Sequence, residues 1–595
     1  MFCRPLPLLA VFALFVSSAA LPAEEPKPVT LAHVKLAGSM DEGPVADDPL
    51  FGASAENFKA KLDRIRKAKD DSAVGGLFLQ LDGIEASWGK VDELRRAVAD
   101  FRKSGKKAIA YLEAGELPDY LVALACDQVC MPESGWLMLV GLRAEATFYK
   151  DLLGKLGLKA DMLQMGDFKG AAEPYTRSSM SPEFRRQLES VLDDFFDKSV
   201  VETIVRARAG KGWTAEQVKQ LIDRGPYTAK AARDKGLIDR IAYADQVPDL
   251  MKAALKAEQV KLAKDYAKAK GEEIDFSNPI TAMMKLLSPP KATNSPNPKV
   301  AVIYATGIIT TGKSSSNPLT GDTVGSTTLI EAIQQAEKDK TVQAIVLRVD
   351  SPGGSALASD LIWNELARCK KPLVASMSDV AASGGYYISM AAQKIYAESG
   401  TLTGSIGVVG GKVVLGGLYD KVGVKTEVIS RGANAGILSS TTAFSDSERA
   451  AMTSLMKDTY DQFLDKALAG RKKAGRAMTR AELEKLAGGR IWTGRQAKAN
   501  GLVDELGTLE DAILAARDLA GMDKEKMPEL LILPKARSLL DTLIEGRSSS
   551  QLGLQQLPVL RELPELAGHV RHVEGLLQLR GEPVWLILPY QLRVR

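Results

Sequence analysis

The chain has 595 residues, of which 45% are hydrophobic and 26% are charged, and its formal net charge is +4. This composition excludes a disordered chain and a polytopic membrane protein, and the length predicts two to four domains. The charges are spread along the chain without a basic stripe, so we expect no nucleic-acid partner.

Residues 1–25 predict a secretory signal sequence or an N-terminal membrane anchor. Arg4 precedes an apolar run from Leu6 to about Ala23, and small residues close that run. A run of about 18 residues is at the lower limit for spanning a bilayer, so cleavage and retention both stay open. In either case we expect the body of the protein to be exported.

The rest of the chain contains an internal repeat at a spacing of about 265 residues. The matching segments are Val74–Asp82 with Val342–Asp350, Glu133–Gly135 with Glu398–Gly400, and Tyr227–Asp239 with Trp492–Asp504. Self-similarity over such a distance predicts two homologous domains, at residues 30–255 and 298–525. Residues 256–297 contain a stretch rich in Pro, Ser and Asn, which is typical of a linker.

Short apolar runs alternate with amphipathic segments in the second repeat. We predict strands at 300–304, 344–349 and 373–376, and helices at 328–338 and 356–367. Continuous apolar strands that alternate with helices are typical of a parallel sheet with helical crossovers, so the fold class is α/β. Residues 526–595 form a C-terminal extension, and packing on a neighbour or on a membrane surface are both open for it.

Three glycine-rich junctions distinguish the second repeat from the first. They are Asp350–Gly354, Ala381–Tyr386 and Thr401–Gly407. Glycines at the start of a helix let backbone N–H groups face an anion or an oxyanion. The first repeat has Asp82–Ala86 and Glu116–Tyr120 at the first two of these places, so it resembles a scaffold without a nucleophile.

Ser383 lies just before two glycines, where an apolar helix begins. A serine at such a turn is exposed beside backbone donors, as a nucleophile requires. The alternative is that Ser383 only caps the helix. Three glycine-rich junctions in one repeat favour the nucleophile.

A serine nucleophile needs a base, and the three histidines limit the choice. They are His33, His569 and His572, so none lies between residues 34 and 568. A Ser-His-Asp triad is therefore nearly excluded. Lysine is the remaining common partner, provided that burial keeps it neutral. Composition alone does not choose among the lysines.

The combined motifs Asp350–Ser355, Ala381–Ser389 and Leu402–Gly407 resemble those of the signal peptide peptidase A (protease IV) family, in its long, duplicated bacterial form. The resemblance covers residues 30 to about 525. It implies a tandem duplication of a Clp protease/crotonase-like domain and a serine endopeptidase with a Ser-Lys dyad. It also implies that the substrates are cleaved signal peptides and other apolar peptides, that the protein is a homo-tetramer, and that it is membrane-associated at the periplasmic face of the bacterial inner membrane.

The same resemblance implies the site residues. In the long form the lysine base comes from the first repeat, and the matching segment Gly166–Pro174 places it at Lys169. The equivalent point in the second repeat falls at about Ala433, so that repeat has no base of its own. The expected oxyanion donors and the hydroxyl that holds the lysine amine are Gly354, Gly384 and Ser405. No cofactor and no metal are implied.

Two further patterns lead to other readings. Gly307–Ser314 fits the P-loop pattern, but a loop follows it where a P-loop would open a helix, so we expect no nucleotide. Cys126 and Cys130 lack a second pair to complete a zinc site, and buried thiols or a disulfide are both open.

The alternatives to a peptidase are an inactive Clp/crotonase-like scaffold and an acyl-CoA enzyme. Export argues against the acyl-CoA enzyme, because CoA is cytoplasmic.

Overall fold

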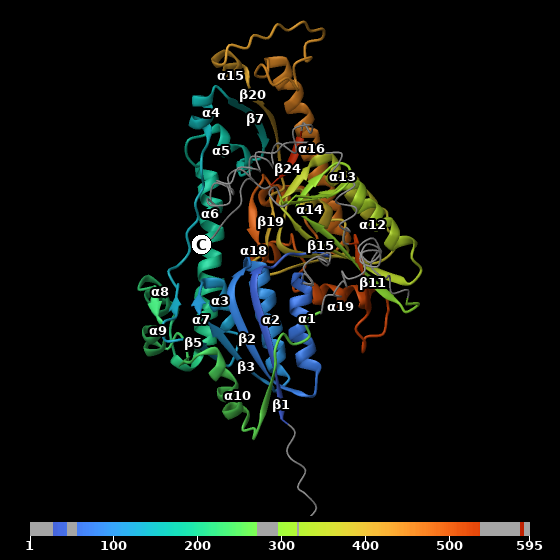
Figure 1. Ribbon diagram of the computed structural model, residues 1–595. Helices are drawn as coiled ribbons and strands as arrows, with labels where there is room; N and C mark the ends of the chain where they lie inside the picture. The colour runs from blue at the N-terminus through green and yellow to red at the C-terminus, as the bar shows by residue number, and fades with distance from the viewer. Residues whose placement is uncertain (1–27, 45–55, 270–294, 318–320, 536–583, 588–595) are drawn as a thin grey trace, which may run out of the picture.

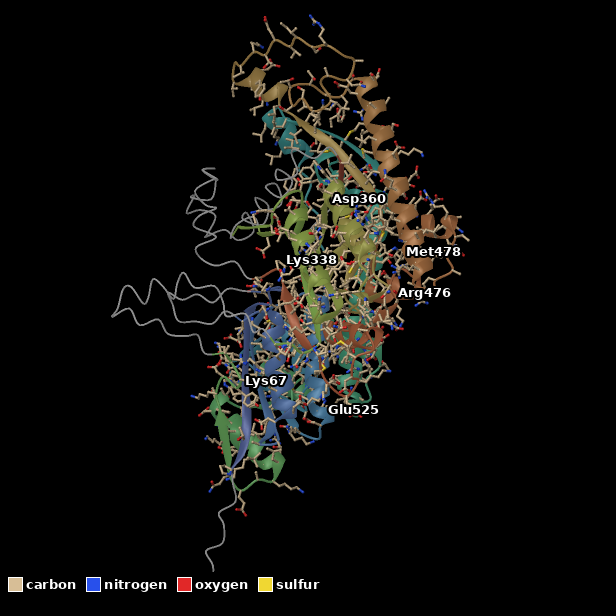
Figure 2. All side chains as sticks on the ribbon, turned by 90° about the vertical axis from the view of Figure 1, so that its right-hand side faces the viewer. Lys67, Lys338, Asp360, Arg476, Met478 and Glu525 are labelled. Carbon is tan, nitrogen blue, oxygen red and sulfur yellow. The ribbon has the colours of Figure 1, made fainter. Side chains whose placement is uncertain are left out.

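The computed structural model describes residues 28–44, 56–269, 295–317, 321–535 and 584–587 (Figure 1). The sheet of the first repeat and its helices α1 and α2 (within 58–103) and α10 (247–255) form the lower part of the molecule in Figure 1, while α4, β7 and α5 of the same repeat (within 150–176) reach the upper part, beside the second repeat. Figure 2, turned by 90°, shows Lys67 in the first-repeat half and Lys338 and Asp360 in the other. The N-terminal segment 1–25 lies outside the described residues, and no helix within them is long and apolar enough to cross a membrane.

Each repeat is built on a parallel sheet. The first has the order β10 (Val260–Ala263), β1 (Val29–Ser39), β2 (Val74–Glu85), β3 (Lys107–Leu112), β5 (Gln128–Met131) and β9 (Arg240–Ile241). The second has the order β23 (Glu529–Leu533), β11 (Lys299–Thr306), β15 (Val342–Ser351), β17 (Leu373–Ala382), β18 (Lys394–Ala397) and β22 (Glu505–Leu506). The two orders match strand for strand, which confirms the predicted tandem α/β duplication.

The helices repeat as well. The corresponding pairs are α1 (Phe58–Asp70) with α12 (Ser326–Lys338), α2 (Trp88–Lys103) with α13 (Ala356–Arg368), α3 (Leu117–Ala123) with α14 (Gly384–Ser389), α4 (Lys150–Leu156) with α15 (Gly416–Lys421), α8 (Ala215–Asp223) with α17 (Arg480–Leu486), α9 (Ala229–Lys235) with α18 (Gly494–Ala499), and α10 (Val247–Leu255) with α19 (Leu509–Leu519). α5 (Glu173–Thr176), α6 (Pro182–Asp194) and α7 (Glu202–Ala207) lie where the second repeat has the long α16 (Asp446–Lys473). The strands and helices predicted for the second repeat are confirmed.

Both faces of the central strands are buried, which explains their continuous apolar sequence. In β11, Val300, Val302 and Tyr304 pack on one face with residues of α19. Ala301 and Ile303 alternate with them and join the larger core beneath α12 and α13. Because successive side chains of a strand point to opposite faces, a strand with helices on both sides must be apolar throughout.

A third sheet joins the repeats. Its order is β13 (Ser315–Asn317), β14 (Gly321–Gly325), β12 (Ile308–Thr310), β16 (Gly353–Ser355), β24 (Val584–Ile587), β20 (Val408–Val414) and β7 (Lys159–Met165). β7 belongs to the first repeat and pairs antiparallel with β20 of the second along its whole length, near the top of Figure 1. Smaller strands complete the chain: β19 (Leu402–Gly404) pairs with β17 and β21 (Ile491–Thr493), and β4 (Ala114–Gly115), β6 (Trp136–Leu137) and β8 (Tyr227–Thr228) form a separate sheet.

A buried ion network makes a second contact between the repeats. Arg348 on β15 donates to Glu42 at 2.6 Å and to Glu93 on α2 at 2.8 Å, and each of the three side chains is 1% exposed. Lys90 on α2 bonds Asp350 and Asp379 of the second repeat, each at 2.9 Å. Buried charges are stable only when paired, so this network requires the two repeats to be docked.

Three elements lie in segments that the sequence did not assign to a repeat. β10 lies within 256–297, which we predicted as linker, and it adds an edge strand to the first sheet. β23 and β24 come from the extension 526–595, and they pair with β11 and with β16 and β20. Residues 270–294, 536–583 and 588–595 lie outside the described residues.

Candidate active site

Ser383 stands at a strained turn between β17 and α14. Its backbone has φ 56° and ψ −111°, in the left-handed region that non-glycine residues rarely adopt. The Ser383 side chain makes no capping hydrogen bond to α14, so it is not held as a helix cap. Strain of this kind persists only where the surroundings enforce it, and it collects at functional sites.

Lys169 is brought to the second repeat by β7. After β7 ends, the Phe168 N–H donates to the Gly488 carbonyl at 2.9 Å. A Cβ on Gly489 would lie only 2.5 Å from the Lys169 Cα, so the second repeat approaches the lysine backbone at a distance that only glycine permits. The Lys169 side chain is completely buried.

The structure brings Lys169, Ser383 and Ser405 together. Lys169 Nζ lies 2.7 Å from Ser383 Oγ, 214 residues away in sequence. The same amine lies 2.9 Å from Ser405 Oγ and 3.0 Å from the Ser405 carbonyl oxygen. All three side chains are fully buried. The amine is therefore surrounded by hydroxyl and carbonyl oxygens.

Burial alone lowers the pKa of Lys169 well below its ordinary value. The charged form of an amine is disfavoured where water is excluded, and a nearby carboxylate would oppose the shift. None of the groups that shift this pKa is a carboxylate. The geometry thus favours a neutral amine with a lone pair at hydrogen-bond distance from a serine oxygen.

Ser405 is fixed by its own backbone. Its φ is 52°, again in the left-handed region, and its N–H donates to the Arg490 carbonyl at 2.8 Å. Ser383 is tied to the same loop, because its N–H donates to the carbonyl of Gly404 at 2.8 Å. One short segment therefore positions both the serine and the lysine amine.

The two predicted oxyanion donors lie close to one another. A Cβ on Gly384 would lie 3.2 Å from the Gly354 nitrogen. The neighbouring Gly353 N–H donates to Ser351 Oγ at 3.1 Å, and Ser351 Oγ donates to the Gly307 carbonyl at 2.6 Å. The junction Asp350–Gly354 was predicted from the sequence, but the hydrogen bonds that Ser351 makes to Gly353 and Gly307 were not. A serine inside a glycine-rich junction was the available signal.

Neither repeat has both groups at its own copy of this place. Glu116 stands before α3 in the first repeat, where Ser383 stands before α14 in the second. Gly157 and Gly166 correspond to Gly423 and Gly432, so the counterpart of Lys169 is Ala435, two residues beyond the position we predicted, about Ala433. Within the described residues, this candidate site therefore takes Lys169 from the first repeat and Ser383 from the second.

Other candidates from the sequence are placed as follows. Cys126 and Cys130 are buried free thiols. After Gly307–Ser314 the chain continues into β13 and β14, and the next helix begins only at Ser326. Within the described residues, no group of three or more His, Cys, Asp or Glu side chains is arranged to hold a metal ion.

The sequence was compared with protein families and with characterised proteins. The model of peptidase family S49 matches residues 100–258 and 365–523, at the spacing of the internal repeat. A chloroplastic serine protease SPPA of Arabidopsis thaliana is 34% identical over 520 residues, which cover 86% of this chain and 73% of that protein. Protease 4 of Salmonella typhi is 32% identical (84% and 78% covered), and protease 4 of Haemophilus influenzae is 30% identical (82% and 78% covered).

Proposed function

Because the chain belongs to peptidase family S49 and is a serine protease, we propose that Ser383 is its nucleophile and Lys169 its general base. The observation that carries this proposal is the 2.7 Å distance between Lys169 Nζ and Ser383 Oγ in a fully buried setting. A general base must lie within hydrogen-bond reach of the proton that it removes.

The surroundings of the amine fit this role. A neutral amine has two N–H donors and one lone pair. The two oxygens of Ser405 accept the N–H groups, so the lone pair faces the Ser383 hydroxyl. Lys169 takes the hydroxyl proton as Ser383 Oγ attacks the peptide carbonyl carbon, and it then passes that proton to the leaving amine.

Two backbone donors stabilise the oxyanion that forms. The Gly384 N–H lies directly after the nucleophile, and the Gly354 N–H lies on the adjacent junction. The Gly353 N–H is engaged by Ser351, which favours its neighbour as the second donor. Water then attacks the acyl-enzyme with Lys169 again as the base, and the acid product leaves Ser383 free.

The substrate class is apolar peptides, including cleaved signal peptides. Ala171, Ala172, Val409, Met162 and Ile308 belong to one apolar cluster, and its two alanines closely follow Lys169 in sequence, so we take this cluster as the lining of the substrate groove. A site with this lining accepts aliphatic segments and disfavours acidic ones, because a buried carboxylate would find no partner. The protein acts at the periplasmic face of the inner membrane, where such peptides are released, and cell fractionation tests this location.

The site is tested by active-site labelling. A phosphonylating serine probe should modify a single peptide, the one that contains Ser383, and Ser383→Ala should remove both the label and the hydrolysis of Leu- and Ala-rich peptides. Ser389→Ala is the matched control, because Ser389 lies on the same helix and its hydroxyl only donates to the Gly385 carbonyl. Labelling elsewhere, or full activity in Ser383→Ala, would exclude the proposed nucleophile.

The repeat also supports a homo-oligomer, expected from the family resemblance to be a tetramer. Within one chain, β7 and α4 of the first repeat pack against β20 and α15 of the second. The counterpart of β7 is the segment 425–431, and the counterpart of β20 is 142–148. Residues 421–430 are all exposed, with Val428 at 65% and Ile429 at 90%.

We infer that these two counterparts pair with one another on different copies. Segment 425–431 of one chain would pair with 142–148 of the next, by the same geometry that joins β7 to β20. The double substitution Val428→Asp/Ile429→Asp should therefore reduce the particle mass, measured by light scattering, to that of one 64.0 kDa chain. Leu519→Asp, at a residue that is also 50% exposed, serves as the control. A wild-type chain that is already monomeric would exclude the assembly.

A further inference from the structure

The C-terminal strand β24 lies inside the sheet that carries the candidate site. It runs antiparallel to β16 on one side, where Gly354 pairs with Leu586 and Ser355 with Trp585. It runs antiparallel to β20 on the other side, where Val409 pairs with Trp585. Figure 1 shows β24 beside β20 and above α14, the helix that begins after Ser383.

Without β24, two strand edges would face one another across a gap one strand wide. β16 contains both glycines of the Asp350–Gly354 junction, and β20 leads on to β7 and so to Lys169. An extended peptide that enters such a gap gains main-chain hydrogen bonds on both sides, while its alternate side chains select the sequence. The position of β24 is thus the position expected for an extended peptide substrate.

The carbonyl of Leu586 lies close to Gly353, which is next to the proposed oxyanion donors. A Cβ on Gly353 would lie 1.9 Å from the Leu586 carbonyl oxygen and 2.7 Å from the Gly384 nitrogen. Gly353 has φ 97°, so both its conformation and its surroundings require glycine there. The Leu586 carbonyl therefore borders the amide that follows the nucleophile.

The side chains of β24 fill both faces of the gap. Val584 and Leu586 join the core of the second repeat, where Leu586 is fully buried. Trp585 and Ile587 pack on Ala171, Ala172 and Val409, and these two alanines closely follow Lys169 in sequence. Four consecutive apolar residues of β24 thus pack alternately into two apolar clusters.

We propose that the strand Val584–Ile587 is a tethered occupant of the substrate groove, and that it competes with peptide substrates for the dyad. The proposal rests on the proposed function, because it treats the Ser383–Lys169 site as the peptidase site. It also names a substrate feature: the residue whose carbonyl enters the oxyanion hole is Leu-like, as Leu586 is.

The size of the effect follows from the tether. A segment that belongs to the same chain as its binding site competes at an effective concentration of about 1 mM. If the free segment binds with an inhibition constant of about 0.1 mM, its release from the groove raises kcat/KM about tenfold. A charge at position 586 releases the strand, because a carboxylate in that fully buried place has no partner.

The kinetic test uses the full-length chain. Leu586→Asp should raise kcat/KM on a fluorogenic Leu-rich peptide about tenfold. The control is Leu519→Asp, the same change at a residue of α19 that is 50% exposed, and it should behave as wild type. A synthetic peptide of residues 582–588 should inhibit Leu586→Asp competitively. An unchanged or lower kcat/KM in Leu586→Asp, with a normal control, would overturn the proposal.

A second measurement does not depend on activity. Val409 and Trp585 are cross-strand partners, so Val409→Cys/Trp585→Cys in a Ser383→Ala background should form a disulfide within one chain, identified by mass spectrometry. The pair Val409→Cys/Leu519→Cys should not, because Leu519 lies on α19, outside this sheet. Absence of the first disulfide, or one that joins two chains, would overturn the tethered strand. Absence of peptidase activity in the chains that retain Ser383, with the disulfide present in the Ser383→Ala background, would instead overturn the proposed function.

Discussion

The substitution Arg348→Met tests whether the buried ion network stabilises the docked repeats without positioning the dyad. Methionine keeps much of the arginine stem and removes the guanidinium. Glu42 and Glu93, each 1% exposed, then lose the cation that they share, at 2.6 Å and 2.8 Å. Ser376 and Ser378 lose a donor as well.

Removal of one partner from a buried ion pair destabilises a protein by about 3–5 kcal/mol, because the remaining charge stays buried. Burial by itself raises the pKa of Glu42, but Arg348, Lys90 and Ser378 together outweigh burial and lower that pKa. The stability from Glu42 is therefore present above its unfolded pKa and is lost as pH falls through the lower, folded pKa. Consequently, the deficit of Arg348→Met should be largest at neutral pH and should shrink on acidification.

The dyad should survive this change, because Lys169 is positioned by β7–β20 pairing and by the bond from Phe168 to Gly488. We expect the urea midpoint to fall by the equivalent of about 3–5 kcal/mol, and kcat/KM to stay within about twofold below the transition. Adding Glu42→Gln and Glu93→Gln should recover most of the loss. The exposed pair Lys103–Asp100 provides the control, since Lys103→Met should cost at most about 1 kcal/mol. An unchanged midpoint, or lost activity with an unchanged midpoint, would refute the reasoning.

The remaining predictions concern the dyad. Ser383→Ala should fold normally and lose about 10⁴–10⁶ of kcat, measured in a preparation free of other proteases; most of the activity remaining would contradict the nucleophile. Lys169→Met and Lys169→Arg should both lose activity, because neither supplies a neutral base, and a working Lys169→Arg would disprove that role. Wild-type kcat/KM should rise tenfold per pH unit up to the lowered pKa of Lys169 and then level off; a flat profile would contradict this. Between that folded pKa and about 10.4 only the unfolded chain holds the lysine proton, so wild-type stability should gain about 1.4 kcal/mol per pH unit relative to Lys169→Met; parallel pH profiles in calorimetry would contradict the shift.

The sequence predicted the central strands well because they are buried on both faces. The run Val300–Tyr304 is apolar throughout, and the glycine-rich junctions Asp350–Gly354 and Ala381–Tyr386 mark where two later strands end. Ser383 was also predicted as the nucleophile from a local pattern, because two glycines follow it at the end of a strand. Such signals are local, so they need no knowledge of distant partners.

The third sheet was not predictable in this way. β7 is only partly buried, and its partner β20 lies in the other repeat. β24 has four residues and pairs with segments far away in sequence. Lys169 was identified by family resemblance and not by spacing, and Arg348 is a charge inside an apolar strand whose partners come from the first repeat. Pairing between strands of different repeats, such as β7 with β20, leaves no periodic pattern of apolar residues in the sequence of either strand.

The 214 residues that separate Lys169 from Ser383 also set the order in which the site can come into existence. A chain is made from its N-terminus, so the base emerges long before the nucleophile, and the strand that occupies the groove emerges last. A nascent or prematurely ended chain therefore holds a base without a nucleophile. A cut between the two repeats that lets them separate leaves neither piece with both groups. With the proposed nucleophile and base in different repeats, this protease has no complete site during synthesis or after such a cut.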